Sequence, residues 1–124
     1  AVRLAREKAG RVILATNPIF PPCAVRTRLS WVGLTPEEFD FVTTYDNSCF
    51  CKPNPDYYRA ILSRHSLDAA RCLMIGNDIG EDMAPTKEVG LSQFFVTDCA
   101  IRRGLTHDGP QGGFSELLAY LRSL

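Results

Sequence analysis

The stretch RCLMIGNDIGEDM, residues 71–83, joins a short apolar run to a cluster of acids. Residues 71–76 form a compact apolar run of the kind that a parallel sheet buries on both faces. Asp78, Glu81 and Asp82 follow closely, and acids in this position either stabilise the start of a helix or bind a cation. Asp78 comes directly after the predicted strand, where neither helix capping nor solvation is expected to require its charge.

Three further apolar runs indicate strands, at residues 11–16, 39–45 and 92–97. Between them lie helical patterns that begin at typical caps and prolines, such as Asn54 before Pro55. These patterns cover residues 1–9, 21–33, 35–38, 54–66, 81–90 and 114–124. Pro85 must lie in the first turn of its helix or kink it. Strands that alternate with helices predict one α/β domain over residues 1–124, with a parallel sheet and helices on both faces.

The composition excludes several classes of protein. With 14 basic and 14 acidic side chains and a pI near 6.9, the chain lacks the basic excess of a nucleic-acid-binding protein. No apolar run approaches the roughly 20 residues of a transmembrane helix, and the charged residues 1–10 do not resemble a signal peptide. The cysteines lack paired spacing, which favours a reducing cytoplasm, and Cys72 in its apolar run is expected to be buried. The C-F-C at residues 49–51 leaves a metal-binding alternative open.

Polar residues follow each predicted strand, and ligands of such sheets bind beyond the carboxyl ends of the strands. In chain order these residues are Thr16 and Asn17, then Lys52, then Asn77, Asp78, Glu81 and Asp82, and finally Asp98. A hydroxyl, backbone amides and an ammonium group suit the oxygens of a phosphate, whereas the carboxylates suit Mg²⁺. Each residue alone also has an ordinary structural interpretation, so the prediction depends on their joint arrangement. An anion site beside a cation site is what phosphoryl transfer requires.

These residues, in this order, resemble the haloacid dehalogenase superfamily of Mg²⁺-dependent phosphohydrolases. VILATNP, residues 12–18, is similar to the second motif of that family, a strand that ends in Thr or Ser. CKPNPDYY, residues 51–58, is similar to the third motif, whose lysine precedes a helix. MIGNDIGEDM, residues 74–83, is similar to the fourth, with acids spaced D-x-x-x-D. The resemblance extends from about Arg11 to the end of the chain and implies the Rossmann-like core fold of the family.

The resemblance also implies roles for individual residues. Thr16 would donate a hydrogen bond to the phosphoryl group, together with the backbone at Asn17, and Lys52 would neutralise charge on the phosphate and the nucleophile. Asp78 would bind Mg²⁺ directly, and Asp82 would complete the metal site by orienting a metal-bound water or the lysine. The side chains of Asn77 and Glu81 would position these residues without themselves binding the phosphate or the metal ion.

The first motif of the family, Asp-x-Asp-x-Thr or Ser, does not occur in these residues. That motif supplies the nucleophile, the general acid/base and another metal ligand, so the 124 residues alone are expected to be inactive. In the family its strand lies between the second-motif and fourth-motif strands, and its loss would expose two unpaired edges. We therefore expect a fragment of a longer hydrolase that lacks this strand and a cap domain, and whose sheet another chain or segment completes.

The expected substrate is a small phosphorylated metabolite, with neither nucleic acid nor a membrane as a partner. An alternative is a catalytically inactive relative that acts as an interaction or regulatory module. The chain order of the acids disfavours a phospho-receiver domain, and the acids themselves disfavour a dehalogenase that needs no Mg²⁺. His65 and His107 lack a nucleophilic partner that would indicate a hydrolase triad. Trp31, Tyr57 and Tyr58 are interpreted as packing residues.

Overall fold

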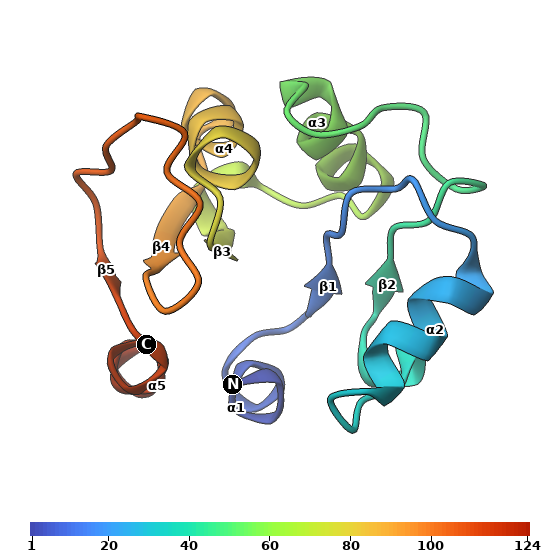
Figure 1. Ribbon diagram of the computed structural model, residues 1–124, viewed down its shortest axis with the longest axis horizontal. Coiled ribbons are helices and arrows are strands. Elements are labelled where there is room, and N and C mark those ends of the chain that lie inside the picture. Colours follow the sequence, from blue (N-terminus) through green and yellow to red (C-terminus); the bar gives the residue numbers. More distant parts are fainter. The chain divides into compact units, whose positions relative to one another are not determined.

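The computed structural model describes residues 1–124, which divide into two compact units. The N-terminal unit comprises residues 2–51, and the C-terminal unit comprises residues 52–124 together with Ala1. Each unit has its own sheet, with the order β1-β2 in the first and β3-β4-β5 in the second (Figure 1). Every strand pair is parallel, which confirms the predicted α/β class with parallel pairing.

The N-terminal unit contains α1 (Val2–Lys8), β1 (Ile13–Leu14), α2 (Pro22–Ser30), the 3₁₀-helix η1 (Pro36–Glu38) and β2 (Phe41–Val42). In Figure 1, β1 and β2 lie side by side with their arrowheads pointing the same way. Both strands are shorter than residues 11–16 and 39–45, and hydrogen bonds from side chains to the backbone flank them. Asp40 accepts from the Val12 N–H at 2.7 Å, and the Thr43 hydroxyl donates to the Thr16 carbonyl at 2.6 Å.

Two predictions for α2 and η1 have different outcomes. The short helix at residues 35–38 is confirmed, and its Thr35 and Glu38 form the reciprocal capping box that the spacing predicts. The interpretation of Trp31 as a packing residue is wrong, because its side chain is 75% exposed. The helix ends at Ser30, and the chain then turns through Gly33 with a φ of 70°. Trp31 therefore lies beyond the helical face that packs inward.

The C-terminal unit begins with α3 (Pro55–Arg64), η2 (Ala69–Arg71), β3 (Leu73–Gly76) and the π-helical turn η3 (Ile79–Met83). It continues with α4 (Ala84–Val89), β4 (Ser92–Val96), β5 (Gln111–Gly112) and α5 (Phe114–Ser123). The segment at residues 81–90, expected to be one helix, is thus the end of the π-helical turn η3 followed by the short α-helix α4. Pro85 lies in the first turn of α4, as predicted, where its missing N–H costs no helical hydrogen bond. The sequence did not predict β5, since Gln111–Gly112 carries no apolar pattern.

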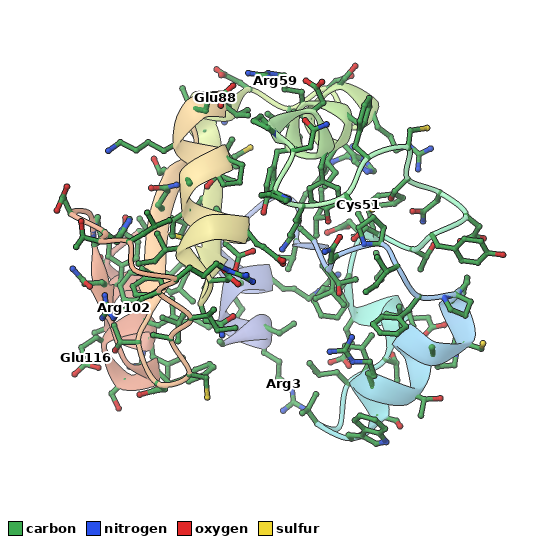
Figure 2. The ribbon with its side chains drawn as sticks, turned by 45° about the horizontal axis from the view of Figure 1, so that its top comes forward. Arg3, Cys51, Arg59, Glu88, Arg102 and Glu116 are labelled. Carbon is green, nitrogen blue, oxygen red and sulfur yellow. The ribbon has the colours of Figure 1, made fainter.

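Helix α3 has the ends that the sequence indicates. The Asn54 side chain accepts from the Asp56 N–H at 2.9 Å, and His65 is the residue that follows the last turn. Arg59 of α3 and Glu88 of α4, which lie close together in Figure 2, form an ion pair at 3.0 Å. None of the helices, of which the longest have ten residues, combines the length and hydrophobicity needed to cross a membrane.

The core of the C-terminal unit forms around β4, whose Phe95 is fully buried against Ile79 and Met83. Tyr57 and Tyr58 are buried too, as their interpretation as packing residues predicts. Residues 73–76 of β3, however, are only half-buried. The sequence predicts burial on both faces, but β3 has a strand partner, β4, along one edge alone. Cys72, directly before β3, is half-buried for the same reason.

Replacing Phe95 with alanine should destabilise the C-terminal unit by about 3–5 kcal/mol, because it leaves a cavity at the most buried point of the core. The measurement is the free energy of unfolding in urea, followed by circular dichroism. Phe114→Ala is the matched control, since Phe114 is 55% exposed and its truncation should cost far less. Equal losses for the two variants would contradict this assignment of the core.

The N-terminal unit should lose stability in acid through Glu37. Hydrogen bonds lower the pKa of Glu37 to about 2 from its ordinary value near 4.5, first that from the Arg26 guanidinium 2.7 Å away and then those from its own backbone and from Thr35. The folded state therefore favours the charged form, and its contribution is present above the unfolded-state pKa and lost as the pH falls through the lowered one. Glu37→Gln should flatten the dependence of the unfolding free energy on pH between roughly pH 5 and pH 2.

Both side chains of this pair are more than half exposed, so added salt should reduce the effect. Arg26→Gln removes the other partner and should flatten the same part of the profile. An unchanged slope in both variants would show that the pair does not contribute to folding.

Candidate active site

The C-terminal unit brings most of the predicted site residues together at the carboxyl end of β3. Lys52 precedes α3, and its ammonium group lies 2.6 Å from Oδ1 of Asp82 in η3. Both side chains are only 8% exposed. Oδ2 of Asp82 accepts hydrogen bonds from the backbone N–H groups of Asn77 and Asp78, at 3.1 and 3.2 Å. The Asp82 carboxylate thus folds back over the end of the strand and holds the lysine there.

This arrangement requires a glycine at the last position of β3. A Cβ atom on Gly76 would lie 2.6 Å from the Cβ and Cγ of Asp82, closer than such atoms approach in proteins. The sequence MIGND therefore does more than end a strand. The missing side chain at Gly76 makes room for the carboxylate that accepts the next two backbone N–H groups.

Tyr58 is a site residue that the sequence analysis interpreted only as packing. Its hydroxyl donates to the Glu81 carbonyl at 2.8 Å and lies 3.5 Å from Oδ1 of Asp82. Burial raises the pKa of Tyr58, and the charge of Asp82 raises it further, so the phenol remains a protonated donor. The rings of Tyr57 and Tyr58 also lie 5.9 and 5.8 Å from the Lys52 ammonium, within the range of cation–π attraction. The one signal in the sequence is general: a buried tyrosine usually finds a hydrogen-bond partner for its hydroxyl group.

Asp78 caps a helical turn, which corrects the expectation that capping would not require its charge. Its Oδ1 accepts from the backbone N–H groups of Gly80 and Glu81, at 2.9 and 3.0 Å. Asp78 also forms a bidentate ion pair with Arg103, whose Nη2 lies 2.7 Å from Oδ2 and whose Nε lies 3.0 Å from Oδ1. The bonds from Arg103, followed by those from the two amides, lower the pKa of Asp78, so it remains a carboxylate.

Arg103 was not found from the sequence, and no local signal indicated it. The residue lies in the loop between β4 and β5, 25 positions after Asp78 in the chain. Its Nη2 also lies 3.4 Å from Oε1 of Glu81. The arginine thus joins two of the three predicted acids, whereas Lys52 pairs with the third.

The acids fit Mg²⁺ in part. Oδ2 of Asp78 accepts no backbone hydrogen bond, and both it and Oε1 of Glu81 face one point, the position of Arg103 Nη2. Both oxygens of Asp82, in contrast, already accept from donors of the same unit. No group of three or more His, Cys, Asp or Glu side chains is placed to hold a metal, but Mg²⁺ needs only one or two carboxylates beside its waters. Asp78 with Glu81 is therefore the pair that could hold the ion, with Asp82 positioning the lysine.

Three further polar residues of the C-terminal unit, Asn77, Asp98 and His107, contact neighbouring segments. The Asn77 side chain donates to the Cys99 carbonyl at 2.6 Å and so holds the loop after β4. Asp98 accepts from the Phe114 N–H at 2.7 Å and so caps the start of α5. His107 lies in the same loop, with its ring against that of Phe95.

Thr16 and Asn17 belong to the N-terminal unit, where they follow β1. The fully buried Thr43 fixes this turn by donating from its hydroxyl to the Thr16 carbonyl. A pocket of about 450 Å³ in the same unit is lined by the start of α2 and the residues after β2. Neither Thr16 nor Asn17 lines it. Cys49 and Cys51 are exposed and belong to no metal-binding group.

Comparisons with known proteins agree with this α/β fold. Residues 49–111, half of the chain, match the family model described as HAD-hydrolase-like. A crystal structure of a HAD phosphatase from Thermococcus onnurineus matches 98% of this chain and 53% of its own, with a TM-score of 0.71 and 22% identity. An uncharacterized protein from Listeria monocytogenes serotype 4b matches 99% of this chain and 78% of its own, with a TM-score of 0.62 and 13% identity. A search of curated proteins gave no match.

The chain belongs to the HAD-hydrolase-like family, as the motifs of the sequence imply. The matched residues include Lys52 and all the acids that follow β3. The chain spans about half the length of the Thermococcus phosphatase structure, and the likeness to that structure concerns the fold. The family typically uses Mg²⁺.

Replacing Lys52 with methionine should destabilise the C-terminal unit by about 3–5 kcal/mol, because the buried Asp82 loses its only charged partner among the hydrogen bonds described above. The unfolding free energy in urea measures this loss. Lys87→Met is the matched control, since Lys87 is exposed on α4 and its charge has no comparable burial. A loss below about 1 kcal/mol, the value of a surface pair, would show that the Lys52–Asp82 pair is solvated.

Proposed function

We propose that this chain supplies the phosphate-binding and Mg²⁺-binding residues of a phosphohydrolase that acts on a small phosphorylated metabolite. The observation that carries the proposal is the buried ion pair of Lys52 and Asp82 beside the Asp78 carboxylate, at the carboxyl end of β3. A positive charge fixed next to a carboxylate that can accept a cation is the combination that phosphoryl transfer needs. Its place beyond a parallel strand is where ligands of such sheets bind.

Each residue would contribute in its own way. Asp82 accepts one N–H bond of the Lys52 ammonium, which fixes the position of a charge that would offset that of a phosphate oxygen. Tyr58 holds the backbone of the turn that carries Asp82. Asp78 would bind Mg²⁺ with Glu81 nearby, and the bound ion would offset the remaining charge of the phosphate. In the N-terminal unit, Thr16 and the backbone at Asn17 would donate hydrogen bonds to phosphate oxygens.

The nucleophile would come from outside these residues, because they contain no Asp-x-Asp. Strand β3 pairs with β4 alone, and β1 pairs with β2 alone, so each sheet has a free strand edge. Unpaired edges accept further strands. We propose that a strand from another segment or chain adds there and carries the attacking carboxylate. The same absence of Asp-x-Asp supports the second candidate, an inactive relative that acts as an interaction or regulatory module.

The coding sequence upstream of the codon for Ala1 separates the two candidates first. A strand ending in Asp-x-Asp-x-Thr or Ser would favour the hydrolase. A start codon directly upstream, with no such motif, would favour the interaction module.

The natural polypeptide that carries these residues and such a motif should hydrolyse p-nitrophenyl phosphate in a Mg²⁺-dependent reaction, whereas residues 1–124 alone should not. Lys52→Ala should lower kcat by about 10²–10³-fold, the effect of removing one fixed charge-stabilising group. Steady-state kinetics with Mg²⁺ and with a chelator measure both effects. Lys87→Ala is the control and should leave kcat unchanged. Absence of chelator-sensitive hydrolysis from a panel of phosphomonoesters would overturn the enzyme and favour the interaction module.

A further inference from the structure

The guanidinium of Arg103 contacts the two carboxylate oxygens that the predicted cation site would offer to a metal ion. The Nη2 atom lies 2.7 Å from Oδ2 of Asp78 and 3.4 Å from Oε1 of Glu81. Asp78 has one oxygen on two backbone amides, so Oδ2 is the oxygen it can offer to a cation. A guanidinium carries a permanent positive charge and satisfies the same oxygens as a metal ion would.

The local backbone is shaped to let the arginine reach this point. A Cβ atom on Gly80 would lie 3.0 Å from Cδ of Arg103, so a side chain there would press on the arginine stem. Arg103 itself has a φ of 51°, in the left-handed region that few residues other than glycine adopt. Gly104 follows with a φ of 73°. This turn directs the arginine toward the acids of η3.

The contact can also be released without unfolding the loop. Backbone hydrogen bonds hold the loop independently, from Ile79 N–H to the Ile101 carbonyl at 2.9 Å and from Ile101 N–H to the Asn77 carbonyl at 2.8 Å. The Arg103 side chain is 52% exposed, whereas that of Asp78 is 8% exposed. The arginine can therefore move into solvent while the carboxylate remains in place.

We infer that Arg103 is the internal counter-ion of the cation site, which a divalent cation must displace before it binds Asp78. Arg103 therefore sets the affinity of this chain for Mg²⁺ and keeps the carboxylates of Asp78 and Glu81 paired in the absence of the ion. The inference rests on the cation site of the proposed function, but it concerns binding and needs no turnover. Lys52 does not take part in the exchange, because its charge is directed at Asp82.

The test is the affinity of residues 1–124 for Mn²⁺, measured by electron paramagnetic resonance of the free ion, and for Mg²⁺ by calorimetry. Arg103→Gln removes the competing charge and should tighten binding by roughly 3- to 10-fold, the equivalent of one lost charge-assisted contact on a half-exposed side chain. Arg103→Lys retains a charge and should remain nearer the unmodified chain.

Arg102→Gln is the matched control. Arg102 precedes Arg103 in the same loop, is labelled in Figure 2, and stacks its guanidinium over the Phe95 ring at 5.2 Å. Its loss changes the net charge equally, so a general electrostatic effect would move both variants together. Equal tightening in both variants, unchanged or weaker binding in Arg103→Gln, or no binding in any variant would each overturn the inference.

A second measurement needs no substitution. The Nε–H resonance of Arg103 in the unmodified chain should shift during a Mg²⁺ titration, as its bond to Asp78 is lost. A resonance that stays fixed over the titration would overturn the inference. Failure of hydrolysis by the longer polypeptide, with these binding results intact, would overturn the proposed function alone.

Discussion

The buried carboxylate of Asp82 organises the carboxyl end of β3. One oxygen accepts the Lys52 ammonium, and the other accepts two successive backbone N–H groups at the end of the strand. A buried charge costs free energy unless each of its acceptor sites is paired, so every one of these bonds depends on the others. The glycine at position 76 and the hydroxyl of Tyr58 complete the arrangement, one by leaving space and the other by holding the turn.

Asp78 differs from Asp82 in the way its charge is balanced. Two amides satisfy one oxygen, and an exposed arginine from a separate loop satisfies the other. A carboxylate paired with a side chain that can leave is suited to exchange, whereas one paired with a buried lysine is suited to fixing position. The two acids of the D-x-x-x-D spacing thus have unequal environments, although the spacing alone presents them alike.

Much of the fold follows from short stretches of sequence. Apolar runs locate β1 to β4, and caps and prolines locate the helices, because such signals act between residues a few positions apart. Asn54 caps α3, and Pro85 lies in the first turn of α4, as predicted. The sequence located these four strands but gave each of them too great a length, and in the N-terminal unit hydrogen bonds of the Asp40 and Thr43 side chains flank β1 and β2. It missed β5, which has no apolar alternation.

The sequence by itself determined the parallel α/β class, the family, and the residue types that stand beyond the strands. Tertiary structure alone decided how those residues pair. Lys52 pairs with Asp82, 30 positions later in the chain, and Arg103 pairs with Asp78, 25 positions earlier. Neither sequence separation produces a periodic or local pattern. Tertiary structure also left Trp31 exposed, whereas the cap formed by Asp78 is local, to the amides of Gly80 and Glu81. The physical reason is that propensity depends on near neighbours, whereas an ion pair depends on which loops the packed sheet brings together.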